Sequence, residues 1–107
     1  MKIMKQETKL QEKIINLLEN LIKNYNAPII YECRVNRGFA YKKGSPDLWL
    51  SVNGQHIEIE LKVGDNERDS MQIKWETKCK KRNTEYWLIY SYSEFIEKLK
   101  TKIEFQL

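Results

Sequence analysis

Apolar residues recur every three or four positions early in the chain and every second position in its middle. The first spacing, carried by Leu10, Ile14, Leu17 and Leu21, predicts a helix over residues 5–26. Two asparagines and a proline then end it. Residues 28–35, rich in Ile, Tyr and Val, predict a strand. The segment 36–46, with two glycines and a proline, predicts a loop.

The middle of the chain predicts a β-hairpin. Residues 47–52 and 55–63 flank Asn53-Gly54, the strongest short signal for a type I′ turn. A two-residue turn fixes the pairing, so Val52 faces Gln55 and Leu48 faces Ile59. One face of the hairpin is apolar and belongs to the core: Leu48, Leu50, Val52, Ile57, Ile59, Leu61 and Val63. The other face is mostly polar: Asp47, Trp49, Ser51, His56, Glu58, Glu60 and Lys62.

The remaining segments alternate between helix and strand. We expect a helix over 70–82, a buried strand over 85–90 and a last helix over 91–100, where Ser91 and Glu94 have the spacing of a capping box. Residues 102–107 fit either a strand or a tail. The order α-β-β-β-α-β-α predicts one α/β domain over 1–107, with a mixed central sheet flanked by helices.

Composition and charge narrow the class of protein. No apolar run reaches the roughly 20 residues of a membrane span, and the first residues lack the apolar core of a signal peptide. Cys33 and Cys79 form no metal-type pair, which favours a reducing compartment such as the cytoplasm. The net charge of +4 and the pI near 9.0 favour a polyanionic partner.

The predicted register places two carboxylates together. Asp47 faces Glu60 across the hairpin at a Cβ separation of about 5 Å, and like charges so placed repel each other. A divalent cation would offset this repulsion, and Mg²⁺ binds through a few carboxylates and several waters. Lys62 lies on the same face and can reach an attacked phosphate. The alternative is a solvated hairpin face with no function.

Pro46-Asp47 followed by Glu60-Leu61-Lys62 resembles the signature of the PD-(D/E)XK nuclease superfamily. Over nearly the whole chain the sequence is similar to the VRR-NUC family, whose stand-alone members occur in bacteria and bacteriophages. The resemblance implies a restriction-endonuclease-like core and a phosphodiesterase site that uses Mg²⁺ or Mn²⁺. It makes Asp47, Glu60 and the Leu61 carbonyl the metal ligands and Lys62 the catalytic lysine.

The resemblance also implies two accessory residues. A glutamine after the lysine strand corresponds to Gln72, and a glutamate near the start of the first helix corresponds to Glu7, a further candidate metal ligand. Glu12 competes with Glu7, because the helix register is open. Glu58 is an extra carboxylate on the same face, and we expect it at the rim, outside the metal site.

The basic residues then suggest a DNA surface without base recognition. The candidates for phosphate contact are Arg34, Arg37, Lys42, Lys43, Lys74 and Lys78. By resemblance, we expect a homodimeric endonuclease of branched DNA such as Holliday junctions, located in a bacterial cytoplasm or, if phage-encoded, in that of the host. Two alternatives stay open: a sequence-nonspecific or restriction-type nuclease, and a non-catalytic DNA-binding module. Surface exposure is expected for His56, and core packing for Trp87. Core packing is also expected for Trp49 and Trp75, with stacking on unpaired bases as the alternative.

Overall fold

A computed structural model of the chain describes residues 2–34, 44–65 and 67–106. Its elements are α1 (Lys2–Tyr25), β1 (Ile29–Cys33), β2 (Leu48–Val52), β3 (Gln55–Leu61), α2 (Ser70–Lys81), β4 (Glu85–Ile89) and α3 (Tyr92–Lys100). This is the predicted order α-β-β-β-α-β-α. Residues 102–106 contain no strand, so of the two options for the end of the chain the tail is confirmed.

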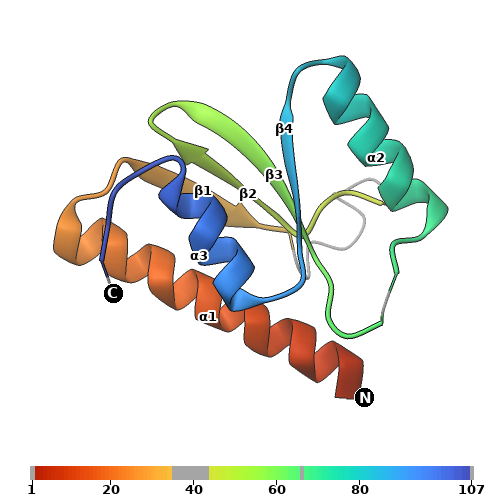
Figure 1. Ribbon diagram of the computed structural model, residues 1–107, viewed down its shortest axis with the longest axis horizontal. Coiled ribbons are helices and arrows are strands. Elements are labelled where there is room, and N and C mark those ends of the chain that lie inside the picture. The colour runs from red at the N-terminus through yellow and green to blue at the C-terminus, as the bar shows by residue number, and fades with distance from the viewer. Residues whose placement is uncertain (1, 35–43, 66, 107) are drawn as a thin grey trace.

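The strands form one mixed sheet in the order β1-β2-β3-β4 (Figure 1). β1 and β3 run antiparallel to β2, whereas β3 and β4 are parallel and are joined through α2. The described residues therefore form a small α/β domain with a four-stranded mixed sheet and three helices. The more specific restriction-endonuclease-like core stays a prediction.

The predicted hairpin register is confirmed. Asn53 and Gly54 have φ values of 51° and 81°, as a type I′ turn requires, and Leu48 pairs with Ile59 while Val52 pairs with Gln55. All seven residues assigned to the apolar face are buried. The turn chemistry and the alternation of side chains thus agree on one register.

The hydrophobic core lies between the sheet and two helices. Ile14 and Leu18 of α1 and Phe95 and Leu99 of α3 are fully buried in one cluster with the apolar face of the hairpin and Trp87 of β4. α1 runs along this face of the sheet (Figure 1). Burial of each large aliphatic side chain contributes about 1.5–3 kcal/mol. In the part of the chain that the structure describes, no helix is both long and apolar enough to cross a membrane.

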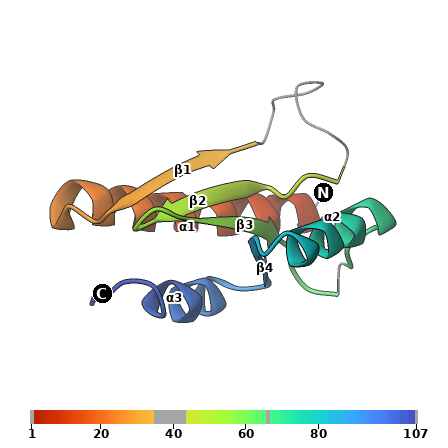
Figure 2. The same cartoon turned by 90° about the horizontal axis from the view of Figure 1, so that it is seen from above.

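α2 lies on the opposite face of the sheet. Glu58 and Glu60 of β3 point away from the core. In α2, Gln72 contacts Glu60, and Cys79 lines a cleft together with Glu58. Figures 1 and 2 place α2 at the same end of the molecule as the first turns of α1. α2 therefore covers the polar face of β3, and Glu58 and Glu60 are only 5% and 1% exposed.

The N-terminus of α3 differs from the predicted capping box in one detail. The Ser91 hydroxyl accepts a hydrogen bond from the Glu94 N–H at 3.2 Å, as expected for an N-cap. The Glu94 carboxylate, however, accepts from the N–H of Tyr90 rather than from that of Ser91. The residue before the cap is thereby fixed.

Candidate active site

Asp47 lies where β2 begins. The β2–β3 ladder ends at the Leu48–Ile59 pair, so the predicted cross-strand pair of Asp47 and Glu60 is not part of it. Instead, the Asp47 carboxylate accepts a hydrogen bond from the backbone N–H of Leu61 at 2.7 Å. The backbone carbonyl of Asp47 accepts a hydrogen bond from the backbone N–H of Arg34, the residue after β1. The side chain thus replaces a backbone acceptor and holds one carboxylate oxygen beside β3.

Glu60 is the most deeply buried ionisable group at this end of the sheet. Its side chain is 1% exposed, and its Oε1 atom has no hydrogen-bond partner among the described residues. Burial, reinforced by the charge of Asp47, raises the pKa of Glu60 to about 9. A buried carboxyl beside a second carboxylate holds its proton at neutral pH unless a cation replaces it.

Gln72 fixes the second oxygen of Glu60. Its Nε2 donates to Glu60 Oε2 at 3.0 Å, while its Oε1 accepts from the N–H of Asp69 at 2.9 Å. Asp69 in turn caps α2 by accepting from the N–H of Gln72. The capping box therefore orients the amide so that its NH₂ group faces Glu60. Gln72 thus contacts Glu60, while its role in catalysis stays a prediction.

Glu7 and Lys62 complete a cluster of four charged residues. Burial raises the pKa of Glu7, an effect that Lys62 opposes and Asp47 reinforces, so the three side chains lie near one another. Lys62 directly follows β3 and also opposes the rise at Glu60. Glu12 is exposed, and Glu7 is therefore the residue of α1 that the fold brings to this cluster. The position of α1 therefore favours Glu7 over Glu12, and the role of Glu7 as a metal ligand stays a prediction.

The cluster has the composition of a magnesium site that is completed by water. Among the residues that the structure describes, no three His, Cys, Asp or Glu side chains converge into a ready-made metal site. Mg²⁺, however, commonly binds through one or two carboxylates and retains several waters. Asp47 and the unpartnered oxygen of Glu60 fit this requirement, with the Leu61 carbonyl and Glu7 as further candidates. Metal binding itself stays a prediction.

We expect the stability of the metal-free protein to depend on Glu60. Because its folded pKa lies above the unfolded value of about 4.5, its contribution is complete below that value and is lost as pH rises toward 9. One titrating proton gives a slope of at most about 1.4 kcal/mol per pH unit. Urea unfolding in EDTA from pH 5 to 9 should show this decline, and Glu60→Gln should flatten it. An unchanged slope in Glu60→Gln, with Glu12→Gln as control, would contradict the assignment.

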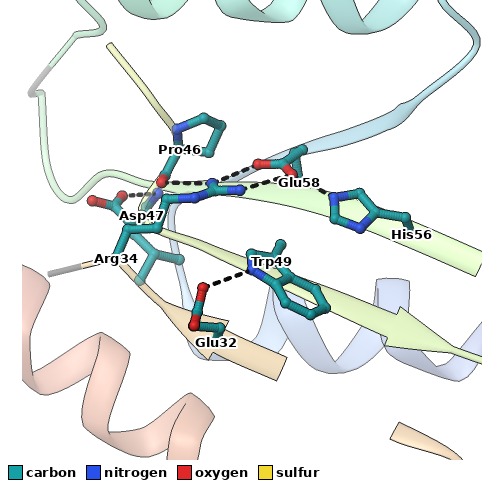
Figure 3. Close-up of polar contacts among 8 residues, drawn as sticks. Glu32, Arg34, Pro46, Asp47, Trp49, His56 and Glu58 are labelled. Atoms are coloured by element: carbon teal, nitrogen blue, oxygen red, sulfur yellow. Dashed lines mark hydrogen bonds and ion pairs between the residues drawn. The ribbon is translucent and has the colours of Figure 1, made fainter. Parts of the chain in front are cut away.

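Arg34 and Glu58 form a second network beside the cluster (Figure 3). The guanidinium donates to both oxygens of Glu58, at 2.6 and 3.0 Å, and to the carbonyl of Pro46 at 3.0 Å. His56 Nε2 also contacts Glu58. Burial alone would raise the pKa of Glu58, but the hydrogen bonds from Arg34 and His56 outweigh it and lower the pKa. This carboxylate is therefore held ionised by its partners.

Two predictions need correction here. Glu58 was expected at the rim, yet it is buried under α2 and bound by Arg34. Arg34 was predicted to hold a DNA phosphate, yet its side chain is only 14% exposed and is bound to Glu58. Burial of the Glu58 carboxylate is costly unless a cation pairs with it. The strand order places β1 so that Arg34, the residue after this strand, supplies that cation. Arg34 therefore stabilises the fold next to the site.

The other basic candidates differ in what the structure shows of them. Lys74 and Lys78 are exposed on α2, so a contact with DNA stays a prediction for both. Arg37, Lys42 and Lys43 lie outside the described residues.

The aromatic residues on the polar face are less buried than expected. Trp87 is in the core, as predicted, but Trp49 and Trp75 are half-buried and lie outside the core cluster. Trp49 stacks on His56, with 5.2 Å between ring centroids, and donates to Glu32. His56 is exposed, as predicted.

Gly44 fixes the segment that carries Asp47 against α2. Its φ is 87°, and a Cβ atom there would lie 2.7 Å from the backbone of Met71. We expect Gly44→Ala to lower the free energy of unfolding by about 1–3 kcal/mol, from backbone strain and the close contact together. Urea denaturation measures it. Gly54→Ala is the matched control, because its φ is 81° but the space beside it is open. Equal losses in both variants would show that the contact with Met71 adds nothing.

Comparisons of the chain with protein-family models, curated proteins and solved structures gave no match in any of the three. Membership of the VRR-NUC family therefore stays a prediction, and function has to be inferred from the residues of the site.

Proposed function

We propose that this protein is a metal-dependent endodeoxyribonuclease of the PD-(D/E)XK type that acts on branched DNA, with the Holliday junction as the specific candidate. The observation that carries the proposal is the buried Glu60 carboxyl, which has one unpartnered oxygen and lies beside Asp47 and Lys62. Gln72 satisfies the second oxygen of Glu60, and a cation shared with Asp47 would satisfy the first. A cation-binding role accounts for the unpartnered oxygen.

The residues of the cluster divide the work of phosphodiester hydrolysis. When bound, Mg²⁺ or Mn²⁺ supplies charge neutralisation at the scissile phosphate and activates water. Asp47 and Glu60 would hold the ion, and Glu7, whose pKa responds to the charges of Asp47 and Lys62, would be a further ligand. The Lys62 ammonium can donate to the attacking water or to a phosphate oxygen, whose negative charge increases in the transition state. Gln72 keeps Glu60 in position.

The charge and the sequence of the chain support branched DNA as the substrate. The chain is basic, and no base-reading motif is found in its sequence, so shape is the feature of DNA left for it to recognise. A two-fold homodimer would present two such sites to a two-fold substrate. Light scattering of the purified protein, alone and with DNA, tests this part of the proposal.

The test of the activity is a cleavage assay with labelled four-way junction, flap and linear duplex of equal sequence, each with Mg²⁺, Mn²⁺ or EDTA. We expect cleavage that needs metal and favours the junction. Glu7→Gln should slow it, whereas Glu12→Gln on the same helix should not. Calorimetry with Mn²⁺ gives a second readout, in which Glu60→Gln loses the binding seen with the unaltered protein.

Each component of the proposal has its own contrary result. Absence of metal-dependent cleavage on every substrate would refute the nuclease activity and leave a DNA-binding module. Equal cleavage of all three substrates would refute the preference for branched DNA and favour a nonspecific nuclease.

A further inference from the structure

A cleft of about 390 Å³ lies between α2 and the polar face of β3. Its buried floor contains Glu58 and Cys79, and the half-buried ring of Trp75 lines it. The exposed side chains at its mouth are His56, Lys78 and Arg82. This volume is at the lower end of the range for small-ligand sites, about 300–1,000 Å³, and suits a ligand with the size of one nucleotide.

The charge of the cleft favours an anion. Glu58, its one acidic residue among those described, is neutralised by the bidentate hydrogen bonds of Arg34. Lys78 and Arg82 line the cleft and form no ion pair with any carboxylate that the structure describes. The cleft thus has two cationic side chains, Lys78 and Arg82, at its mouth and a neutralised carboxylate, Glu58, at its floor.

An aromatic ring accompanies these cations. The Lys78 ammonium lies 5.6 Å from the centroid of the Trp75 ring. An aromatic plane offers a stacking surface to any base, and adjacent cations hold the phosphate of the same nucleotide. Trp75 and Lys78 therefore match the base and the phosphate of a nucleotide.

The cleft lies beside the candidate active site. Glu58 precedes Glu60 by two residues on the same face of β3, a spacing of about 7 Å. On α2, Trp75 follows Gln72 by three residues and so lies on the same side of the helix. Gln72 contacts Glu60 at one end of this interface, and Trp75 lines the cleft at the other. A DNA strand whose cut phosphate lies at the Glu60 site can therefore place the neighbouring nucleotide in the cleft.

We propose that this cleft binds one unpaired nucleotide of the DNA substrate, next to the phosphate that is cut. The inference rests on the proposed function and adds to it a physical basis for the preference for branched DNA. A base in a continuous duplex is stacked and paired and is therefore not free to enter. A nucleotide at a branch point or in a flap is free to do so.

The experiment measures affinity in EDTA, where no metal-dependent cleavage can occur. The probes are a duplex with a single-stranded flap, carrying 2-aminopurine at the first unpaired position, and the fully paired duplex of the same sequence. We expect Lys78→Ala/Arg82→Ala to weaken flap binding by about tenfold and duplex binding much less. Trp75→Leu should abolish the quenching of 2-aminopurine that binding causes, and Trp75→Phe should retain it.

The matched control removes two charges from the same helix outside the cleft. Lys80→Ala/Lys81→Ala should weaken binding of both probes alike. If the two double variants reduce affinity for flap and duplex equally, or if Trp75→Leu leaves the quenching unchanged, the nucleotide site is refuted. Competition by deoxynucleoside monophosphate at concentrations that match the affinity for the flap would also refute it, because the cleft would then be a site for free nucleotides.

This result is separable from that of the cleavage assay. Selective flap binding without cleavage counts against the nuclease and supports the cleft. Metal-dependent cleavage without selective flap binding supports the nuclease and counts against the nucleotide site in the cleft.

Discussion

Replacement of Lys62 by alanine is expected to lower the rate of metal-dependent DNA cleavage by roughly 10²–10⁴-fold, the usual contribution of a positioned proton donor or acceptor. Lys62 is near Glu60 and Glu7, and it is the lysine whose charge affects both of these carboxyls. Its loss removes a donor to water or phosphate but leaves both carboxylates of the candidate metal site. Single-turnover cleavage of a labelled junction, with the protein in excess, measures the effect.

The matched control is Lys74→Ala, which removes the same charge from an exposed position on α2. It should alter affinity slightly and the cleavage step not at all. Affinity of Lys62→Ala for the junction in EDTA should stay within about threefold of the unaltered protein, as expected from loss of one phosphate contact. If the cleavage rate of Lys62→Ala stays near that of Lys74→Ala, Lys62 has no catalytic role.

Replacement of Arg34 by methionine is expected to cost about 3–5 kcal/mol of folding free energy, because it leaves Glu58 buried without its cation. The side chains of Arg34 and Glu58 are only 14% and 7% exposed, and both oxygens of the carboxylate accept from the guanidinium. Urea denaturation at pH 7 measures the loss. The variant Arg34→Met/Glu58→Gln should recover most of it, since the uncompensated charge is then gone.

The dependence on pH gives an independent check. The pKa of Glu58 is lowered in the folded protein, so the pair contributes fully above the unfolded pKa and is lost as pH falls through the folded pKa. The difference between Arg34→Met and the unaltered protein should therefore shrink in acid. Arg68→Met, which breaks a more exposed pair with Glu76, should cost about 1 kcal/mol or less. An equal loss in Arg34→Met would mean that burial adds nothing.

The sequence was sufficient for the hairpin because its determinants are local. Asn53-Gly54 specifies the turn, the turn specifies the register, and alternation then assigns each side chain to a face. That chain of reasoning identified both the core face and the neighbourhood of Asp47 and Glu60. It went wrong by one residue at the end of the ladder, where a side chain of Asp47 replaced the backbone as hydrogen-bond acceptor.

The placement of α2 was beyond such reasoning. Nothing in its weakly amphipathic sequence indicates that it covers the polar face of β3, and so the burial of Glu58 was missed. The partner of Glu58 is 24 positions away, and only the pairing of β1 with β2 brings Arg34 to it. Glu7 likewise required the docking of α1, which helical periodicity does not specify. An unexpected acid on the outer face of a strand was the available signal that a basic partner is needed.

The side-chain amide of Gln72 belongs at once to the cap of α2 and to the second oxygen of Glu60. The start of the helix and the acid therefore share one rigid group, and neither can shift without breaking a hydrogen bond of the other. Any occupant that moves α2 must change the affinity of Glu60 for its own ligand, and thermodynamic reciprocity requires the converse to the same degree. Gln72 is the residue through which these two affinities are linked, and Gln72→Leu, which can make neither bond, is the substitution that would separate them.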